Sequence, residues 1–419
     1  MTEPRDFLRA LADAAIAAAA PGLRVPAVLP DAPARAIVVG AGKASAAMAK
    51  AVVDAWPDTS LSGVVVTRYG YEVPCERIEI VAAAHPVPDA AGREAAIRVV
   101  EAARTAGPDV LVLALISGGG SALLTAPAGK ISFEDKQEVN RILLRSGADI
   151  VEMNTIRKHI SMVKGGRLAE AAYPAKLLTV LISDVPGDDP AVIASGPTVP
   201  DPSTFAEAMA IVEKYKMDLP ASVLSHLKEG ADETPKPGDR IFEKAAIVYA
   251  AKPDKSIEAA AEVARAAGYA VIDLGDRVEG EAREVGREHA ELALACKAGS
   301  GKEPAPCVIL SGGETTVTMK GDGRGGRNTE YLLGVAERLN GAEGIYAVAC
   351  DTDGVDGSED NAGAFIDPTT LARAAESGLS VTQALANNDA YSLFENIGDL
   401  LVTGPTFTNV NDFRALVVT

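Results

Sequence analysis

The sequence predicts an α/β protein of two domains, each built from a sheet covered by helices. The chain has 419 residues, which exceeds the size at which a single hydrophobic core stops growing. Short runs of Val, Ile and Leu alternate with stretches rich in Ala, Glu and Arg, and several of the apolar runs are continuous, as strands buried on both faces are. Aromatic residues make up only 4%, which suits close packing of helices on sheets better than a β-sandwich.

The strands and helices expected from this alternation favour mainly parallel sheets, with a Rossmann-like sheet in the N-terminal domain. The expected strands are 36–39, 63–67, 78–82, 110–116, 177–182, 246–250, 270–274, 308–310, 345–349, 400–402 and 415–418. The expected helices include an amphipathic opening helix that Pro21 ends, followed by 44–55, 90–105, 256–267 and 279–297.

The clearest break in composition is EGADETPKPGDR at 229–240, a polar stretch with two prolines and two glycines. We place the domain boundary there, which predicts domains at 1–234 and 235–419. A second polar stretch, 298–306, is expected to be a surface loop within the second domain.

The formal net charge of −18 predicts an acidic surface that disfavours nucleic acid and anionic membranes as partners. An enzyme with anionic substrates must then gather Lys, Arg and backbone N–H groups locally, for example in Gly-rich loops. The four cysteines form no CxxC pair and the four histidines no metal-binding spacing, as in a cytoplasmic protein with reduced thiols. No apolar run approaches 18 residues, so we expect no membrane span.

The first Gly-rich loop lies in IVVGAGKASAAMAKA, residues 37–51, between a strand and a helix. Gly40 and Gly42 allow a tight turn, and Lys43 adds a charge where a helix N-terminus already favours anions. The spacing excludes a Walker A loop but is similar to a dinucleotide-binding fingerprint. The next strand ends in Thr67 and Arg68 instead of an acid, and Arg68 would suit NADP, so an oxidoreductase stays open. A Gly-lined turn with an exposed lysine also stays open.

A second loop lies in LVLALISGGGSALL, residues 111–124. Three consecutive glycines after a buried strand expose backbone donors, and Ser117 and Ser121 add hydroxyl groups. These features indicate a site for an anion or substrate.

Two further stretches of the N-terminal half carry charges. SDVPGDD at 183–189 places Asp184 and Asp189 at the carboxyl end of a strand, where they can hold Mg²⁺ or accept a proton, unless this is a solvated acidic turn. NTIRKHISMVKGGRLA at 154–169 is basic and contains Lys164 and Arg167. This cluster predicts an anion contact, with pairing to surface acids as the alternative.

The C-terminal half repeats this chemistry in LSGGETTVTMKGDGRGGRNTE, residues 310–330. Arg327 stands at a helix start, where guanidinium and backbone N–H groups can hold phosphate together, and Glu314 is the acid of the preceding loop. DTDGVDG at 351–357 is no EF-hand, because Ala362 stands where the terminal Glu is needed, and a contact to hydroxyl, ribose or Mg²⁺ fits better. TGPTFTNVND at 403–412 adds hydroxyl and amide donors.

Phosphoryl transfer fits this set of loops, because it asks a protein for positioning and charge neutralisation more than for a covalent nucleophile. No GxSxG elbow competes with it.

The motifs, in this order, resemble the class II glycerate 2-kinases, whose C-terminal half holds the MOFRL domain, here at about 305–415. The matching stretches are GAGKAS, SGGGSALL, KHISMVKGGRLA, SDVPGDD, ASGPTVPD, SGGET, GRGGRN, DTDGVDG with NAGA, and TGPTFTN. The resemblance implies transfer of phosphate from ATP to D-glycerate with Mg²⁺, giving 2-phosphoglycerate, at an active site in the cleft between the domains.

By this resemblance, Lys43 and Arg327 are the main catalytic cations. Asp184 and Asp189 are the candidate metal ligands, and Asp189 is also the candidate base. The residues expected to bind substrate or nucleotide are Gly40, Gly42, Ser117, Gly118, Gly119, Gly120, Ser121, Lys164, Arg167, Ser311, Gly312, Gly313, Glu314, Gly326, Asn328, Asp351, Asp353, Thr406 and Asn409. Thr329 and Phe407 depart from the Gln and Gly usual in the family, and Phe407 puts the identity of the substrate in doubt.

Two alternatives remain open. Members of this family are often named hydroxypyruvate reductase, which would need NAD(P)H. A non-catalytic sugar-phosphate sensor with a SIS-like fold is the other. The expected partners of the kinase are glycerate and ATP, with no nucleic acid and no membrane, and a homodimer stays open.

Overall fold

A computed structural model describes residues 3–419. The chain divides into two compact units. We call Pro21–Ala250 the N-terminal unit, and we call the opening segment up to Ala20 together with Ala251–Thr419 the C-terminal unit. Each is described by itself.

The N-terminal unit is built on a six-stranded sheet in the order β3-β2-β1-β4-β5-β6, and the pairs from β3 to β5 are parallel. This is the strand order of dinucleotide-binding Rossmann sheets, so the expected fold is confirmed. The order reverses between β1 and β4, and ligands of such sheets bind at the carboxyl ends of the strands at that point. The strands are β1 Arg35–Ala41, β2 Ser60–Arg68, β3 Glu79–Ala83, β4 Leu111–Ile116, β5 Lys176–Ile182 and β6 Ala245–Ala251.

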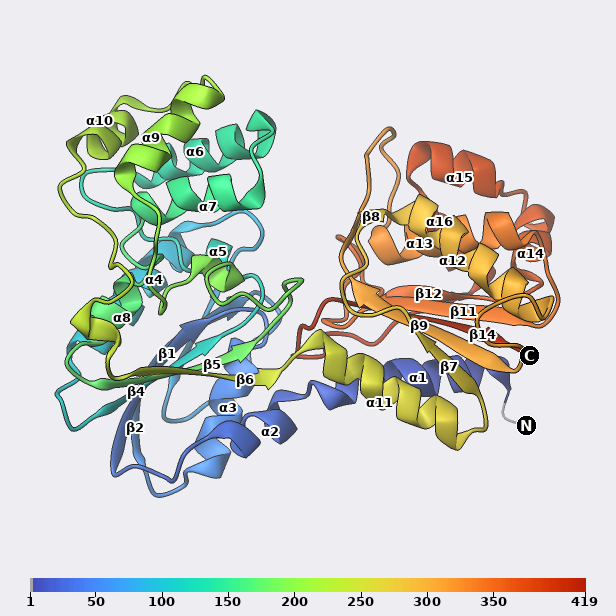
Figure 1. Cartoon of the computed structure of the whole chain (residues 1–419), viewed down its shortest axis with the longest axis horizontal. Helices are drawn as coiled ribbons and strands as arrows, with labels where there is room; N and C mark the ends of the chain where they lie inside the picture. Colours follow the sequence, from blue (N-terminus) through green and yellow to red (C-terminus); the bar gives the residue numbers. More distant parts are fainter. Residues whose placement is uncertain (1–2) are drawn as a thin grey trace. The chain divides into compact units, whose positions relative to one another are not determined.

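Helices cover both faces of this sheet (Figure 1). α3 (Ser45–Ala55) packs on one face, while α4 (Ala90–Arg104) and α8 (Arg167–Ala172) share a core with strands on the other. Four helices stand apart with a core of their own, and Figure 1 shows them together beyond the sheet. They are α6 Phe133–Ser146, α7 Ile150–His159, α9 Phe205–Lys214 and α10 Ala221–Glu229. The short helices of the unit are α2 Pro21–Arg24, α5 Gly120–Leu123, η1 Pro26–Val28, η2 Ile193–Ser195 and η3 Arg240–Phe242.

The division between the units differs from the boundary expected at 234/235. The polar stretch 229–240 is an exposed loop of the N-terminal unit, in which Thr234 donates a 3.0 Å hydrogen bond to buried Asp201. The chain then forms β6, the edge strand of the first sheet, and the division falls after Ala250. Helix α1 (Pro4–Ala18) belongs to the C-terminal unit. A polar, Pro- and Gly-rich composition indicates a surface loop, and such loops occur within domains as well as between them.

The sheet of the C-terminal unit has the order β13-β12-β11-β14-β9-β7. Only the β7–β9 pair is parallel, so the expectation of a mainly parallel sheet is wrong here. β14 inserts between β9 and β11 and runs against both, and β12 runs against both β11 and β13. The strands are β7 Ala270–Asp273, β9 Cys307–Gly313, β11 Ile345–Asp351, β12 Gly363–Ile366, β13 Leu400–Leu401 and β14 Asp412–Val418, with a separate small pair of β8 Gly280–Glu281 and β10 Thr315–Thr316.

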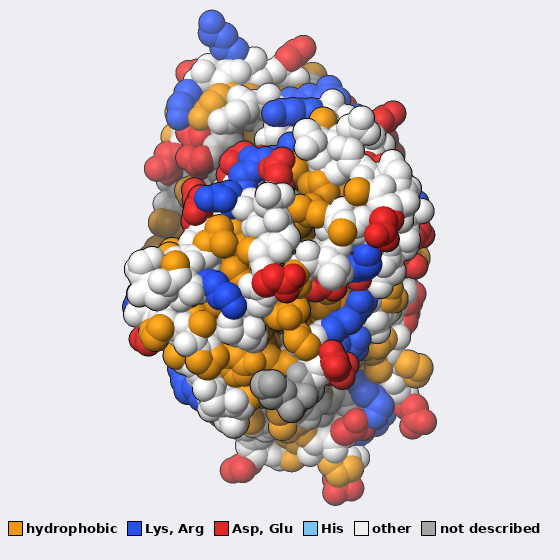
Figure 2. All heavy atoms as spheres, turned by 90° about the vertical axis from the view of Figure 1, so that its right-hand side faces the viewer, with side chains coloured by type: hydrophobic (Ala, Val, Ile, Leu, Met, Phe, Trp, Pro, Cys, Tyr) orange, Lys and Arg blue, Asp and Glu red, His pale blue; other side chains and the backbone are white. Residues whose placement is uncertain are grey.

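Two helix layers enclose this second sheet (Figure 1). α1 and α11 (Pro253–Ala266) pack on one face. α12 (Ala282–Lys297) and α13 (Arg327–Leu339) pack on the other, beside α14 Thr370–Glu376, α15 Val381–Asn387 and α16 Ala390–Ile397. Figure 2 shows one face of the molecule, on which acidic and basic side chains are interspersed around small hydrophobic patches.

Within residues 3–419, no single helix is long and apolar enough to cross a membrane. In that part of the chain, the bent helix pair Pro4–Ala18 and Pro21–Val28 is the one candidate, and it meets the test only when the length and composition of its two helices are combined.

Candidate active site

The loop that carries Lys43 joins β1 to α3 at the point where the strand order reverses. Its glycines are needed because the backbone of β4 runs against them. A Cβ at Gly40 would lie 2.0 Å from the Leu115 carbonyl oxygen, and one at Gly42 would lie 2.1 Å from Ser117 Oγ. The loop can therefore keep this position only with glycine at both places.

Ser117 ties the β1–α3 loop to the loop that follows β4. Its side chain is 0% exposed, and its hydroxyl accepts a 3.0 Å hydrogen bond from the Ala44 N–H at the start of α3. The Lys43 N–H donates to the Gly118 carbonyl at 2.8 Å. Ser117 and Gly118, both expected to bind ligand, thus hold the two loops together, and Ser117 uses an N–H group that an anion at α3 would need.

Gly119 is the point where Lys43 meets a residue that the sequence did not single out, His85. Gly119 has a φ of +80°, and a Cβ built on it would lie 3.1 Å from the His85 ring and 3.4 Å from Lys43 Cγ. Both side chains are partly exposed. Lys43 therefore stands over a glycine at the carboxyl end of β4, where the Rossmann-like order places ligands.

Gly120 and Ser121 rest on a left-handed turn at 194–196. A Cβ at Gly120 would lie 2.7 Å from Ala194 Cβ, so glycine is required there. The Ser121 hydroxyl lies 2.6 Å from that of Ser195, which donates at 3.2 Å to Asn154 Oδ1. Ala194 and Ser195 have φ values of 52° and 61°, a strained conformation for residues other than glycine. Such a conformation persists only where the surrounding structure holds it, so Ser195 is held in place, and its hydroxyl contacts that of Ser121.

A pocket of about 380 Å³ adjoins the Ser121 loop and is lined by four cations. Arg141 pairs with Glu138, and the other three come from three segments. Lys136 comes from α6, Arg157 from α7, and Lys164 from the turn before α8. The rest of the lining is apolar or uncharged: Pro86, Val87, Pro88, Ser121, Ala122, Thr125, Gln137, Asn140 and Leu144.

Lys136 and Lys164 are each only 2% exposed. Lys136 Nζ donates to the carbonyls of Ala126 at 3.2 Å and Ile160 at 3.1 Å, and Lys164 Nζ donates to that of Ser121 at 2.7 Å. Arg157 donates to two asparagine oxygens over long distances, 3.4 Å to Asn140 Oδ1 and 3.5 Å to Asn154 Oδ1. In the part of the chain that the structure describes, none of the three forms an ion pair with a carboxylate.

The electrostatic consequence appears in the pKa values of these groups. Burial, with smaller contributions from neighbouring Arg157, lowers the pKa of Lys136 to about 7. Burial, with Lys136 and Arg157 nearby, lowers the pKa of Lys164 well below its ordinary value. Burial also lowers the pKa of Arg157. Positive charge gathered here without a counter-charge favours an anionic ligand.

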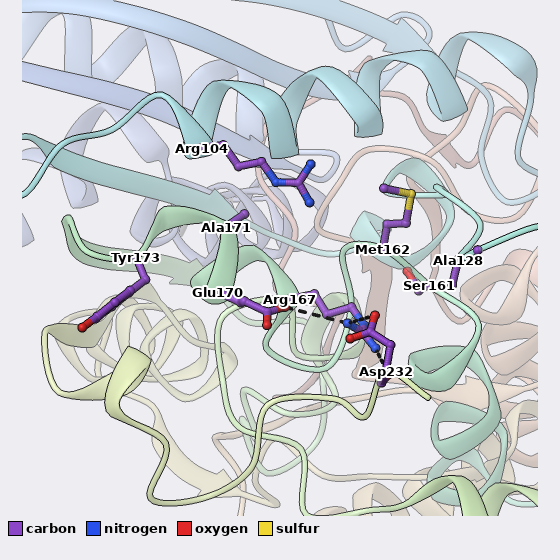
Figure 3. A pocket seen from close by; sticks show the side chains of 10 residues that line it. Arg104, Ala128, Ser161, Met162, Arg167, Glu170, Ala171, Tyr173 and Asp232 are labelled. Carbon is purple, nitrogen blue, oxygen red and sulfur yellow. Dashed lines mark hydrogen bonds and ion pairs between the residues drawn. The ribbon is translucent and has the colours of Figure 1, made fainter. Parts of the chain in front are cut away.

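Arg167, predicted to contact an anion together with Lys164, lies in a different pocket of about 640 Å³. Figure 3 shows its guanidinium pointing to Asp232, with Glu170 beside it. Arg167 Nη1 lies 2.8 Å from Asp232 Oδ2 and 3.8 Å from Glu170 Oε2. The alternative left open by the sequence, pairing with surface acids, describes Arg167, whereas Lys164 lies in the pocket without acids.

The acidic loop after β5 forms no preformed metal cage. Asp189 Oδ1 accepts a 2.8 Å hydrogen bond from the Ala191 N–H, and the side chain of Asp184 is partly exposed. Among residues 3–419, no group of three or more His, Cys, Asp or Glu side chains is placed to hold a metal ion. The assignment of Asp184 and Asp189 as metal ligands stays a prediction.

In the C-terminal unit, Arg327 begins helix α13, as the sequence predicted, but acids surround its guanidinium. It lies 2.8 Å from Glu314, 2.8 Å from Asp412 and 3.0 Å from Asp351, and it donates to Asn411 Oδ1 at 2.8 Å. The side chain is 24% exposed. Burial opposes its charge, but Asp412, Asp351 and Glu314 together raise its pKa well above the ordinary value. The guanidinium is thus rigidly held and permanently charged.

Two buried carboxylates organise this end of α13. Asp412 accepts hydrogen bonds from Arg327, from Asn328 Nδ2 at 2.8 Å and from Arg414, and it is fully buried. Asp356 accepts from the N–H groups of Asn328 and Thr329, both at 2.9 Å, and so caps the helix. Burial raises the pKa of Asp356, while these N–H bonds oppose the rise.

The other candidates of this unit mostly shape the backbone around Arg327. Gly313 has a φ of +113°, and a Cβ there would lie 2.4 Å from the backbone of Val278, while a Cβ at Gly326 would lie 2.3 Å from Asp356. Ser311 and Asn328 are buried. The Asp351 and Asp353 carboxylates accept from backbone N–H groups of their own loop, at 3.0 and 2.8 Å, and the Thr406 N–H donates to the Asp353 carbonyl at 3.1 Å. Gly312 lies at the end of β9, and Asn409 Oδ1 accepts from the Asn411 N–H at 3.3 Å.

Comparison with known proteins finds a family match in each half of the chain. The family described as "Domain of unknown function (DUF4147)" matches residues 7–228, and the MOFRL family matches residues 307–412. A D-glycerate 2-kinase of Thermotoga maritima is 40% identical over 90% of this chain and 89% of that protein.

The chain belongs to the class II glycerate kinase family.

Two further comparisons extend this result. The crystal structure of a glycerate kinase from Thermotoga maritima superposes with a TM-score of 0.90 at 37% identity and covers 99% of both chains. A protein of Agrobacterium vitis named "Putative hydroxypyruvate reductase" is 55% identical over 99% of this chain and 94% of its own. Within the glycerate kinase family, the MOFRL region expected at about 305–415 is confirmed.

Proposed function

We propose that this protein is an ATP-dependent glycerate 2-kinase, which converts ATP and D-glycerate to ADP and 2-phosphoglycerate. The observation that carries the proposal is the 40% identity to a D-glycerate 2-kinase over 90% of the chain. A loop geometry suited to phosphoryl transfer supports it, with Lys43 held over Gly119 at the reversal of the strand order.

The chemistry asks the protein to orient the substrate hydroxyl and to neutralise the transferring phosphoryl group. We assign the neutralisation to Lys43 and Arg327. Lys43 acts as a point charge at the end of a flexible stem, whereas Arg327 offers a planar guanidinium whose orientation Glu314, Asp351 and Asp412 fix. A charge held in place in advance needs little reorganisation when the reaction occurs.

Mg²⁺ would enter as the complex with ATP. In such sites one or two carboxylates and the phosphates of the nucleotide hold the ion, so no cage of three acids is needed. Asp184 and Asp189, at the carboxyl end of β5, have the hard oxygen donors that this ion prefers, and they are our proposed ligands. The ion would supply charge neutralisation to the phosphates. We also propose Asp189 as the base for the substrate hydroxyl, by way of the carboxylate oxygen that Ala191 does not use.

The acidic charge supports the proposal that the enzyme acts on small molecules and has neither nucleic acid nor membrane as a partner. The four free cysteines support the proposed cytoplasmic location.

The test is an assay of ADP release with D-glycerate and MgATP, in which enolase coupling identifies the product. Enolase acts on 2-phosphoglycerate directly, so a signal without added mutase is expected. Absence of ADP release with pure protein overturns the proposal, and tight binding of glycerate without turnover would favour the sensor instead.

A second candidate, an NAD(P)H-dependent hydroxypyruvate reductase, is favoured by the name of the relative at 55% identity and by the Rossmann-like strand order. Against it, β2 ends in Thr67 and Arg68 and not in the acid that would hold a ribose hydroxyl. The Arg68 guanidinium carbon lies 5.6 Å from the ring centre of Tyr71. Oxidation of NADH or NADPH with hydroxypyruvate by the pure protein would establish this activity, and we expect none.

A further inference from the structure

The pocket lined by Lys136, Arg157 and Lys164 differs from the surroundings of Arg167 and Arg327, because within residues 3–419 none of these three cations pairs with a carboxylate. Burying a charge without a partner is strongly unfavourable, so such groups are normally paired or neutral. Lys136 and Lys164 are nevertheless almost fully buried. A chain that keeps three such groups together gives up stability, as sites for ligands often do.

The two lysines have hydrogen-bond donors that a ligand can use. An ammonium group has three donors. Lys136 gives two of them to carbonyl oxygens and Lys164 gives one, so one donor of Lys136 and two of Lys164 have no recorded acceptor within residues 3–419. The Arg157 guanidinium adds donors whose contacts to Asn140 and Asn154 are long.

The pocket adjoins the proposed reaction centre along the chain. Pro86 and Val87 of its wall directly follow His85, whose ring lies against Gly119 beside Lys43. Ser121 belongs both to the wall and to the glycine loop, and Lys164 bonds its carbonyl. A small molecule with one end in the pocket therefore has its other end near the loop that carries Lys43.

We propose that this pocket is the subsite for the carboxylate of the hydroxy-acid substrate, with Lys136, Arg157 and Lys164 as its binding residues. The assignment rests on the proposed kinase function and names the part of the substrate that the site recognises. The carboxylate supplies the counter-charge that the three cations lack, and the burial of Lys136 and Lys164 strengthens that attraction. The volume of about 380 Å³ exceeds what glycerate needs, so larger 2-hydroxy acids fit as well.

The experiment compares Lys136→Met and Lys164→Met with Arg145→Met, which removes a charge from an exposed position of α6 outside the pocket. In each pocket variant we expect the KM for glycerate to rise about 10- to 100-fold, as the loss of one charge-assisted hydrogen bond predicts, while the KM for ATP changes less than about twofold. The ratio of kcat/KM for glycerate to that for glycerol, which lacks the carboxylate, should fall by a similar factor. Arg145→Met should change none of these values.

Thermal unfolding separates this proposal from a structural role of the lysines. Without substrate and at pH 6, where Lys136 is protonated, both pocket variants should unfold at a higher temperature than the wild type, by a few degrees, because an unpaired buried charge is gone. Glycerate should raise the Tm of the wild type and have a much smaller effect in the variants. A lower Tm in both variants, or an unchanged glycerate response, overturns the proposal.

The remaining outcomes are also decisive. If the KM for ATP rises instead, the pocket holds phosphate and the carboxylate assignment is wrong. If the wild type has no kinase activity, the proposed function fails, but a thermal shift with glycerate that Lys164→Met abolishes still supports the subsite. If both variants have normal kinase activity and an unchanged KM for glycerate, the proposed subsite is wrong and the proposed kinase function stands.

Discussion

The two units hold their cations in opposite ways. Arg327, in the C-terminal unit, lies within 3.0 Å of three carboxylates, whereas Lys136, Arg157 and Lys164, in the N-terminal unit, contact only neutral oxygens among the described residues. The acids around Arg327 keep its charge and orientation constant. Because the lysines have no carboxylate partner among these residues, their positive charge is left for an anionic ligand to neutralise. The first arrangement suits a group that acts on a developing charge, and the second suits recognition of a charge that the substrate brings.

The largest effect is expected from Arg327→Met. If Arg327 neutralises the transferring phosphoryl group, kcat should fall by about 10³-fold or more. The variant also leaves Glu314, Asp351 and Asp412 facing one another, so its Tm should fall, opposite to the change expected for Lys164→Met. Steady-state kinetics and thermal unfolding measure both. A near-normal kcat removes Arg327 from the catalytic assignment.

Lys43→Met tests the other catalytic cation with a smaller structural change. Lys43 is partly exposed, and the substitution keeps the 2.8 Å hydrogen bond that its backbone N–H donates to the Gly118 carbonyl. We expect kcat to fall about 10²- to 10³-fold with little change in Tm, because an oriented charge is lost from the transition state. Lys50→Met, exposed on the following helix, is the control. Unchanged kcat for Lys43→Met would show that the loop serves only as scaffold.

Asp412→Asn weakens the rigid arrangement without removing the cation. Asp412 is fully buried and bonds Arg327, Asn328 and Arg414 together. Breaking a buried ion pair from one side typically costs about 3–5 kcal/mol, so a large drop in the free energy of unfolding is expected in urea. Asp412→Glu, which keeps the charge, should lose less. If Asp412→Asn keeps wild-type stability, the carboxylates do not hold Arg327 as described.

The sequence located the Arg327 side of this comparison better than the lysine side. Gly-rich loops after apolar runs mark Lys43 and Arg327, and the first sheet follows from its buried strands. Lys136 lies in FEDKQEVNRILLRS, where one lysine among polar residues is typical of a solvated helix face. Its burial arises only when the carbonyls of Ala126 and Ile160 meet it in the folded chain. Asp412 escaped notice because only the insertion of β14 between β9 and β11 brings it to Arg327.

The pH dependence of the two regions should differ. The pKa of Lys136, lowered to about 7 by burial and Arg157, lies within the range of ordinary assays, while that of Arg327 is raised out of it. Lys136 is protonated below about pH 7 and loses its proton above it, so the KM for glycerate should rise up to about 10-fold from pH 6.5 to 8.5. The other charged groups in the pocket wall, Arg157, Lys164 and Arg141, face the same ligand. Lys136→Met should flatten the profile, and an unchanged slope contradicts this role.

Linkage fixes the sign of the matching effect on stability. In the unfolded chain Lys136 titrates near its ordinary pKa of about 10.4, so between pH 7 and 10 the unfolded state binds more protons than the folded state. The free energy of unfolding should therefore gain up to about 1.4 kcal/mol per pH unit from this residue as the pH rises through that window. The difference in urea midpoint between the wild type and Lys136→Met, measured at pH 6.5 and 8.5, isolates the contribution.

The smallest effect is expected from Arg167→Met. Arg167 lies close to Lys164 in sequence and was predicted to share its role, but Asp232 and Glu170 already answer its charge (Figure 3). Because Asp232 is mostly exposed, the pair should contribute no more than about 1 kcal/mol to stability. The KM for glycerate should change less than about twofold. If the KM for glycerate rose as much as in Lys164→Met, a carboxylate partner would not distinguish cations with a structural role from cations that bind substrate. The contrast between the two units would then be wrong.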